Sequence, residues 1–168
     1  MNSCIDWDIR FVAAFATDCP NYVLRPQSED DINFLTALFI ACSPLSASLP
    51  PAMVEHQAHL QQIGHTATHP NASRWIVLSG ETPIGRIVID WEGEGASHCV
   101  DIALLPAEQG KGTGTQLLKA WITVSALLKR DACLQVFANN PAFALYRRLG
   151  FVGSETLDHP MINMVRPA

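Results

Sequence analysis

The sequence lacks a hydrophobic run long enough to cross a membrane. A spanning helix needs about 20 consecutive apolar residues, and even the apolar stretch at 76–89, IVLSGETPIGRIVI, is interrupted by Gly, Glu and Pro. We also expect no secretory signal, because Asp6 and Asp8 precede the short FVAAFA stretch where a signal peptide carries positive charge. The sequence therefore predicts neither an integral membrane protein nor an exported one.

Cysteine pairs and basic stripes are lacking as well. The five cysteines are odd in number, scattered and never spaced as CxxC. This pattern suggests neither a disulfide framework nor a zinc knuckle, and it favours reduced thiols in the cytoplasm. A net charge of -5 without a basic, aromatic-interleaved surface argues against nucleic acid as a partner. Six of the eleven Lys and Arg residues nevertheless lie within 111–148, which predicts a small polyanionic ligand there.

The length and composition predict one compact domain. A chain of 168 residues, 48% of them hydrophobic, can bury a sizeable core. Residues 1–20 show no clear period, and we expect them to be an N-terminal extension of uncertain structure, followed by a single domain over residues 21–168.

Local patterns predict alternating helices and strands. Ser28 and the acids after it favour a helix over 29–41, and Pro50-Pro51 favour a second helix through Gln62 that ends near Gly64. Further elements follow from apolar patterning and turn signals: strands at 22–25, 74–79, 83–91, 97–105, 133–138, 151–154 and 162–165, a long helix after residue 115 and a short helix from Asn140-Pro141 to Gly150. This order predicts a mixed α/β sandwich, with an antiparallel meander in the middle and a β–loop–α–β unit after it.

The loop QGKGTG, at 109–114, joins a strand to an amphipathic helix. Closely spaced glycines indicate positive φ angles or close backbone approach, and the start of the helix offers unpaired amides and a positive dipole end, so we expect an anion site. No window has the spacing of a P-loop. Gly110, Gly112 and Gly114 are spaced GxGxG, which also differs from the GxGxxG of dinucleotide-binding loops.

Gln109, Gly112 and Gly114 match the pattern [Gln/Arg]-x-x-Gly-x-[Gly/Ala], and NNPAFALYRRLGF at 139–151 matches Asn-x-x-Ala-x-x-x-Tyr-x-x-x-Gly-Phe. In both signatures the chain resembles the GNAT superfamily of acetyl-CoA-dependent N-acetyltransferases, whose pyrophosphate loop has the first form. The resemblance covers about residues 72–155 by signature, and residues 22–64 by element order. It implies a mixed, mostly antiparallel sheet of about six to seven strands flanked by about four helices.

The resemblance also implies which residues hold acetyl-CoA. The amides from Gln109 to Gly114 would bind the pyrophosphate, and the backbone of Leu104, with Leu105 beside it, would meet the pantetheine and polarise the thioester carbonyl. The expected cofactor-binding set is Leu104, Leu105, Gln109, Gly110, Lys111, Gly112, Thr113, Gly114, Thr115, Asn139, Ala142, Tyr146 and Arg148. The competing interpretation of Tyr146 is an ordinary ring buried in the core. The competing interpretation of Arg148 is a solvated side chain on the face of a helix.

Catalytic roles follow in the same way. Tyr146 is the expected general acid toward the departing thiolate, and Leu104 the backbone donor to the oxyanion. Asp101 is a candidate base, with Glu92 and Glu94 as alternatives acting through water. Four histidines at 56, 59, 65 and 69 lack a further ligand, so we expect no metal; they are interpreted as surface residues or as part of a substrate site.

The sequence therefore predicts transfer of an acetyl group from acetyl-CoA to an amine of a small molecule, peptide or protein, by direct attack in a ternary complex, since no Cys or Ser in the motifs offers a covalent carrier. The alternatives are a non-catalytic acyl-CoA sensor and an acyltransferase for longer acyl groups. The acceptor is left open, and so is the oligomeric state, which includes a homodimer.

Overall fold

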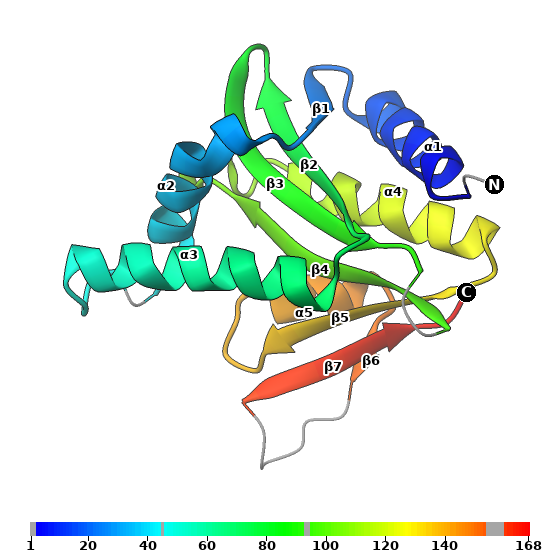
Figure 1. Cartoon of the computed structure of the whole chain (residues 1–168). Coiled ribbons are helices and arrows are strands. Elements are labelled where there is room, and N and C mark those ends of the chain that lie inside the picture. Colours follow the sequence, from blue (N-terminus) through cyan, green and yellow to red (C-terminus); the bar gives the residue numbers. More distant parts are fainter. Residues whose placement is uncertain (1–2, 45, 93–94, 154–159) are drawn as a thin grey trace.

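The computed structural model describes residues 3–44, 46–92, 95–153 and 160–168. They form one seven-stranded sheet in the spatial order β1-β2-β3-β4-β5-β7-β6, with five α-helices around it (Figure 1). The strands are β1 (Tyr22–Pro26), β2 (Ser73–Ser79), β3 (Thr82–Asp90), β4 (Ala96–Leu104), β5 (Asp131–Phe137), β6 (Val152–Gly153) and β7 (Met161–Arg166). The helices are α1 (Ser3–Asp18), α2 (Ile32–Cys42), α3 (Pro51–Thr68), α4 (Thr113–Leu127) and α5 (Ala142–Arg148), with 3-10 turns η1 (Glu29–Asp31) and η2 (Pro106–Glu108).

The predicted α/β class with a mixed, mostly antiparallel sheet is confirmed. β2, β3 and β4 form the expected antiparallel meander, and β4 and β5 are parallel, with α4 as the crossover between them. Every other neighbouring pair in the described sheet is antiparallel. No helix in the described part of the chain is both long and apolar enough to cross a bilayer.

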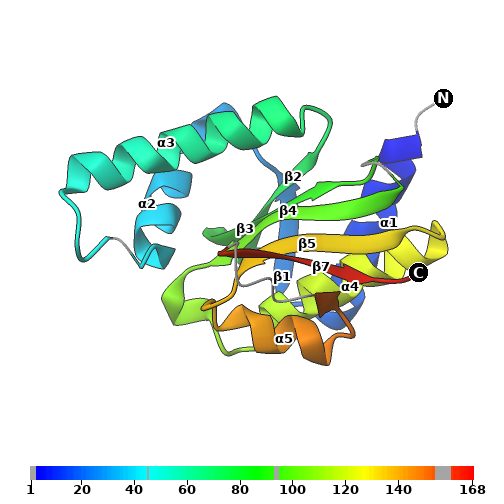
Figure 2. The ribbon, with the colours of Figure 1, turned by 90° about the horizontal axis from the view of Figure 1, so that it is seen from below.

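The helices lie on both faces of the sheet. Figure 2 shows α2 and α3 over one face, and α1, α4 and α5 over the other. The main hydrophobic core lies on the second face, where Phe11 and Phe15 of α1 and Leu117 and Trp121 of α4 are at most 1% exposed. The smaller core under α2 and α3 includes the buried side chains of Leu38 and Val54.

The N-terminal segment is a helix that packs beside α4 in the main core. Asp8 ties it to the sheet, since its carboxylate accepts hydrogen bonds from Trp91 Nε1 and Ser73 Oγ, each at 2.9 Å. Trp7 and Phe11 also meet the Trp91 ring edge-on, with ring centroids 6.4 and 6.0 Å apart. α1 therefore shares the core of the sheet.

The start of α2 differs in detail from the sequence expectation. The first turn is η1, and the α-helix begins at Ile32 rather than at residue 29. Asp31, 5% exposed, accepts two hydrogen bonds from Arg25, at 2.6 and 2.8 Å, and one from the Ser28 amide at 2.8 Å. The hydrogen bonds from Arg25 lower the pKa of Asp31 to about 2, against the opposing effect of burial.

α3 is longer than predicted. It continues to Thr68, so Gly64 lies inside the helix and does not terminate it. Arg74 from β2 explains the extension, because its guanidinium donates to the carbonyl oxygens of His65, His69 and Ala72 near the end of α3. Cationic side chains commonly satisfy the last carbonyls of a helix in this way.

Candidate functional site

β4 and β5 part from each other halfway along β4. Their parallel pairing covers only Ala96–Cys99 against Asp131–Leu134. At that point β4 carries a bulge, because Val88 and Ile89 of β3 pair with Asp101 and Cys99 and leave Val100 as an extra residue. Bulges bend a strand and are frequent beside active sites. The rest of β4 pairs with β3, and the rest of β5 with β7.

The backbone of Leu104 faces the side on which β4 has left β5. The next residue, Leu105, donates its amide to the carbonyl of Ile84, the residue before Gly85, at 2.8 Å. Hydrogen-bonded and non-hydrogen-bonded residues alternate along an antiparallel pair, so the amide of Leu104 is directed away from β3. Leu105, in contrast, has its amide engaged within the sheet.

The carbonyl of Leu104 is held by two side chains. Gln109 Nε2 donates to it at 2.8 Å, and Cys42 Sγ, from the end of α2, donates at 3.2 Å. The side chain of Gln109 thus joins the glycine loop to the end of β4, a role separate from the expected role of its backbone amide.

The glycine loop ends in the left-handed conformation that starts α4. Gly110 has φ 74° and Gly112, the N-cap of α4, has φ 91°. The first helical hydrogen bond runs from the Gln116 amide to the Gly112 carbonyl, so the amides of residues 113–115 have no partner within the helix. This is the geometry of an anion-binding helix start. Lys111 stands beside it, 51% exposed and paired with Glu108 at 3.0 Å.

The remaining expected cofactor residues differ in exposure. Thr113 is buried, Thr115 and Ala142 are half-buried, and Asn139 and Arg148 are exposed. The adjacent Asn140 accepts a hydrogen bond from the Ala142 amide at 2.9 Å, so it caps α5 and leaves the exposed Asn139 beside it for other contacts.

Tyr146 lies in the main core with only 7% of its surface exposed. Its ring meets Phe151 edge-on at 6.1 Å, and within the described chain its hydroxyl has no hydrogen-bond partner. Burial raises the pKa of Tyr146 well above its usual value, and the neighbouring Cys99 and Asp101 add to the effect. The phenol is therefore protonated at neutral pH, as a proton donor must be.

Asp101 points to the opposite face of the sheet, where it pairs with Arg86 of β3. The Nε–Oδ2 distance is 2.5 Å, and Arg86 is only 5% exposed. Arg86 also donates to Nδ1 of His65 on α3, at 3.1 Å. Since a guanidinium has no acceptor, Nδ1 of His65 must accept, and a proton on the neutral ring resides on Nε2. Burial lowers the pKa of His65 and so favours this neutral form.

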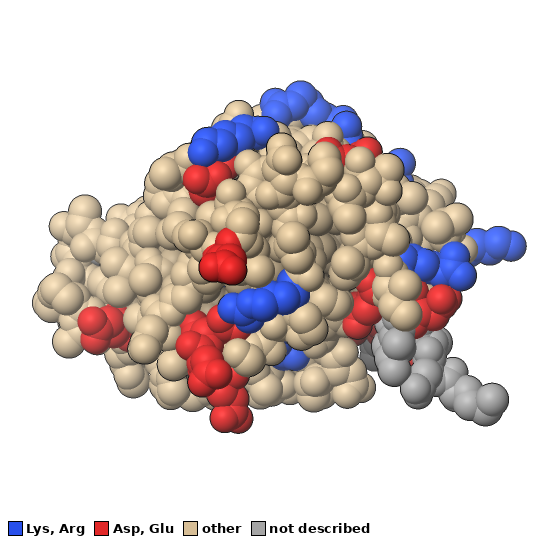
Figure 3. Space-filling view, turned by 90° about the horizontal axis from the view of Figure 1, so that it is seen from above, with Lys and Arg blue, Asp and Glu red and all other residues tan. Residues whose placement is uncertain are grey.

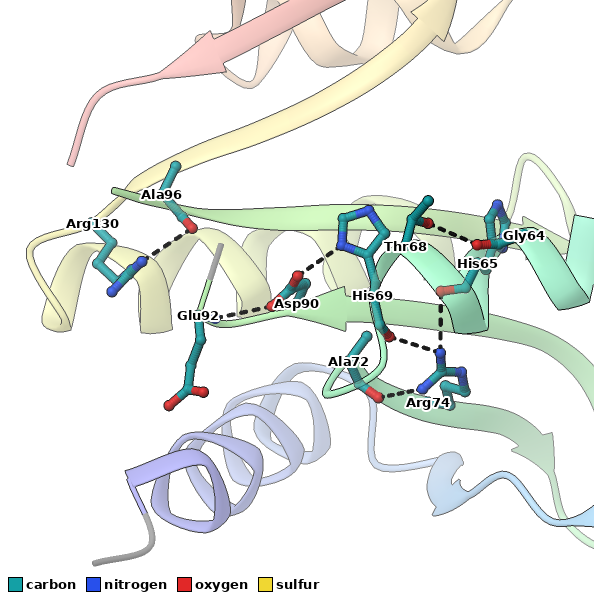
Figure 4. A network of polar contacts seen from close by, with 10 residues as sticks. All are labelled: Gly64, His65, Thr68, His69, Ala72, Arg74, Asp90, Glu92, Ala96 and Arg130. Carbon is teal, nitrogen blue, oxygen red and sulfur yellow. Dashed lines mark hydrogen bonds and ion pairs between the residues drawn. The ribbon is translucent and has the colours of Figure 1, made fainter. Parts of the chain in front are cut away.

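The histidines of α3 and the residue that follows it divide into two pairs. His56 and His59 are exposed, whereas His65 and His69 face the sheet, where His69 Nδ1 lies 2.7 Å from Asp90 Oδ2 (Figure 4). No group of three or more potential ligands able to hold a metal occurs among the described residues. Of the alternative bases, Glu92 is exposed beside Asp90, and Glu94 lies outside the described residues.

Charge is unevenly distributed over the surface. Figure 3 shows several Lys and Arg side chains along the upper margin of the face viewed from above, and a run of acidic side chains over its lower half. The basic residues between 111 and 148 belong to the glycine loop, α4, the turn that follows α4, and α5, and these helices lie on the side of the sheet opposite α2 and α3. More than half of the Lys and Arg residues of the chain therefore lie in or after the glycine loop and before residue 149.

Some residues at this site were missed by the sequence reasoning. A Cβ on Gly85 would lie 2.5 Å from the Ala103 carbonyl oxygen, so Gly85 permits the close approach of β3 to the end of β4. An isolated glycine inside a strand was the available signal. Arg86 and Cys42 carried no local signal, because their partners are 15 and 62 residues away.

The comparison with protein families agrees with this geometry. The model of the acetyltransferase (GNAT) domain matches residues 70–153, which include the parting strands, the glycine loop and α5. The chain belongs to the GNAT acetyltransferase family. No sequence among curated proteins gives a significant match to this GNAT protein.

Solved structures show the same GNAT fold at low sequence identity. PaiA N-acetyltransferase from Thermoplasma acidophilum, in complex with coenzyme A, is 18% identical with a TM-score of 0.66, covering 88% of this chain and 99% of that one. An acetyltransferase from Thermus thermophilus is 20% identical with a TM-score of 0.66, covering 88% and 97%. Ard1 from Thermoplasma volcanium is 17% identical with a TM-score of 0.61, covering 88% and 98%.

Proposed function

We propose that this GNAT protein transfers an acetyl group from acetyl-CoA to an amine by direct attack in a ternary complex. The observation that carries the proposal is the parting of β4 from β5 at the bulge, next to the amide of Leu104 and the free amides at the start of α4. Backbone donors of this kind suit a ligand with amide groups and a diphosphate. The coenzyme A in the complex with PaiA supports the choice of donor.

Each group at the site has a role in this reaction. The amides between Gln109 and Gly114 hold the diphosphate, with the hydroxyls of Thr113 and Thr115 and the charge of Lys111 close by. The amide of Leu104 donates to the thioester carbonyl and stabilises the oxyanion that forms on attack. Acetyl-CoA supplies the acyl group and a thiolate leaving group.

Two side chains on opposite faces of the sheet handle protons. The phenol of Tyr146 donates to the departing sulfur, which its raised pKa permits because it remains protonated. Oδ1 of Asp101 has no hydrogen-bond partner among the described residues, and it accepts the proton of the attacking amine, directly or through a water. Arg86 positions this carboxylate through Oδ2.

Thermal unfolding with acetyl-CoA tests donor binding. At 100-fold excess over Kd, a ligand that binds only the folded state stabilises it by about 2.7 kcal/mol. For a chain of this size that corresponds to a rise in Tm of about 5–10 °C. A Tm that stays constant up to millimolar acetyl-CoA contradicts the proposal. Release of CoA across a panel of amines and acyl-CoAs then identifies the acceptor and separates acetyl transfer from transfer of longer acyl groups.

Tyr146→Phe separates an enzyme from an acyl-CoA sensor. The substitution keeps the buried ring, so we expect unchanged Tm and acetyl-CoA affinity but a 10²–10⁴-fold lower kcat, roughly the contribution of a general acid. In a sensor there is no amine-dependent CoA release to lose. Asp101→Asn is compared with Asp90→Asn, a matched change on the neighbouring strand; only the first should lower turnover. Equal activity of Asp101→Asn and wild type removes Asp101 as the base.

A further inference from the structure

A chain of three side chains links Asp101, the candidate base, to α3. Asp101 on β4 pairs with Arg86 on β3 through Nε, at 2.5 Å. Nη2 of the same guanidinium donates to Nδ1 of His65 on α3, at 3.1 Å. The three residues lie 15 and 21 positions apart in the sequence, so the fold brings them together. Arg86 is thus held between a strand and a helix.

The bond to His65 fixes the orientation of the Arg86 guanidinium. A guanidinium is planar and rigid, so holding two of its nitrogens defines where the whole group lies. Asp101 holds Nε and His65 holds Nη2. Without the second bond, Arg86 and Asp101 are joined by the bond at Nε, about which the carboxylate can rotate. His65 therefore restrains Oδ2 of Asp101, and with it Oδ1, the oxygen that accepts the amine proton in the proposed function.

His65 is also held through its main chain. Arg74 of β2 donates to the carbonyl oxygens of His65 and His69, at 3.4 and 3.0 Å (Figure 4). These bonds attach the last turn of α3 to the sheet from a strand other than the one that carries Arg86. The main chain and the side chain of His65 thus have separate partners, and its Nδ1 is an acceptor in a fixed position.

The hydrogen bond from Arg86 exists only while His65 is neutral. Both nitrogens of a protonated ring carry a proton, so Nδ1 would present an N–H and a positive charge to the guanidinium. The charged and titratable groups that act on the ring are Asp101 on β4, Arg86 on β3, Arg74 on β2 and His69 after α3. Burial lowers the pKa of His65; Asp101 opposes this effect, and the two arginines and His69 add to it. The ring is therefore mostly neutral at neutral pH.

We propose that neutral His65 is a positioning residue for acetyl transfer, which acts through Arg86 to hold Asp101 in the orientation that accepts the amine proton. This inference rests on the proposed function. Misplacement of a catalytic group by about 1 Å can lower a rate by about 100-fold, so loss of the acceptor at His65 should lower kcat while acetyl-CoA affinity is retained. Protonation of His65 removes the same acceptor and should contribute to the fall of kcat at acid pH.

Two substitutions separate the acceptor from the rest of the ring. His65→Asn places an amide oxygen near the position of Nδ1 and does not titrate, whereas His65→Ala removes the acceptor. Gln62→Ala, at a half-buried residue three positions earlier on the same face of α3, is the control for lost contact between α3 and the sheet. Amine-dependent CoA release gives kcat and KM from about pH 5 to about pH 8, the range in which histidine titrates. Thermal unfolding verifies that each variant is folded.

At about pH 8, His65→Ala should have a kcat about 10–100-fold below that of the wild type with an unchanged KM for acetyl-CoA, whereas His65→Asn and Gln62→Ala should stay close to the wild type. Toward about pH 5, His65→Asn should keep a larger fraction of its kcat than the wild type does, because it has no ring to protonate. Adding His65→Ala to Asp101→Asn should cause no further loss, since both changes disable the same group. In ¹⁵N NMR, Asp101→Asn should lower the pKa of His65, because the lost carboxylate favours the protonated ring.

A wild-type kcat for His65→Ala would overturn the role of His65 while leaving acetyl transfer intact, and so would equal losses for His65→Asn and His65→Ala. Independent, multiplying losses in the double variant would show that His65 does not act through Asp101 and would overturn it as well. Absence of amine-dependent CoA release by the wild type would overturn the proposed function instead. NMR would still test the chain of contacts in that case, since an unchanged pKa of His65 in Asp101→Asn refutes it.

Discussion

Replacing Gly112 by Ala should destabilise the protein, whereas the same change at Gly64 should stabilise it. A Cβ at either position meets no atom within 4 Å, so neither substitution creates a clash. The difference lies in the backbone. Gly112 has φ 91° at the N-cap of α4, whereas Gly64 lies inside the α-helix α3.

The expected magnitudes follow from these conformations. An L-residue in the left-handed region costs about 1–2 kcal/mol, which corresponds to a fall in Tm of about 2–8 °C for Gly112→Ala. Alanine in place of an exposed helical glycine gains about 0.5–1 kcal/mol, so Gly64→Ala should raise Tm by about 1–4 °C. Gly112→Ala should also reduce the Tm rise caused by acetyl-CoA, because the loop amides are reoriented.

Thermal unfolding followed by circular dichroism, with and without acetyl-CoA, measures both effects in one experiment. Gly114→Ala is a second comparison: its φ is not positive, and the added Cβ makes an ordinary 3.5 Å contact with Leu104 Cδ1. It should therefore fold and bind nearly as the wild type does. The reasoning is refuted if Gly112→Ala is as stable as Gly64→Ala, since the left-handed conformation would then not constrain the loop.

Three further predictions concern other parts of the fold. Asp8→Ala should lower the free energy of unfolding by about 1–3 kcal/mol in urea denaturation, because it leaves the Trp91 indole N–H buried without an acceptor. Asp8→Asn retains an acceptor and should lower the free energy of unfolding by less. Equal decreases for the two variants would contradict this reasoning. Because its pKa is lowered, ionised Asp31 contributes about 1–2 kcal/mol to the free energy of unfolding, after allowance for the 35% exposure of its partner Arg25. This contribution is present above the ordinary pKa of 3.8 and is lost as pH falls toward about 2. Asp31→Asn should flatten this part of the stability–pH curve, and an unchanged curve would show that the pair does not contribute. Gly85→Ala should cost about 1–3 kcal/mol through overpacking against β4, measured by urea denaturation, and a wild-type midpoint would show that the strands adjust freely.

The sequence was most informative where a pattern is local. The amphipathic pattern after residue 115 predicted a long helix there, and on α4 the side chains of Leu117, Trp121 and Ser125 are at most 1% exposed. The meander of β2 to β4 and the parallel return to β5 followed from apolar strands and the turns between them. The two GNAT signatures indicated the family, which the domain match then showed.

α1 shows where local patterning was present but overlooked. Trp7, Phe11 and Phe15 are spaced four residues apart, which is a helical period, and the last two are fully buried in the core. The placement of the helix was not accessible in this way, since the bond from Trp91 to Asp8 joins residues 83 positions apart. We expect removal of residues 1–20 to expose this core and unfold the domain, which would move its boundary ahead of α1.

Side-chain partners across the sheet were also beyond local reasoning. Ser97 and Ser125 share a 2.6 Å hydrogen bond in the buried space between β4 and α4, and Trp121 Nε1 donates to Ser97 Oγ at 3.0 Å. Asp101 looked like an isolated acid in the sequence and is in fact paired with Arg86. Such pairs depend on register and on which residues face each other, and a slip of one residue reverses every side chain.

The bulge at Val100 divides the sheet into two units that are paired over only a few residues. β1 to β4 on one side and β5 to β7 on the other are joined directly by the pairing of Ala96–Cys99 with Asp131–Leu134. Beyond this pairing, β4 has an interior edge at which the amide of Leu104 is open to a partner, whereas the Leu104 carbonyl is held by Gln109 and Cys42. An extended molecule with amide groups can add there as a strand does, so a substrate with this chemistry would complete the secondary structure of the protein that binds it.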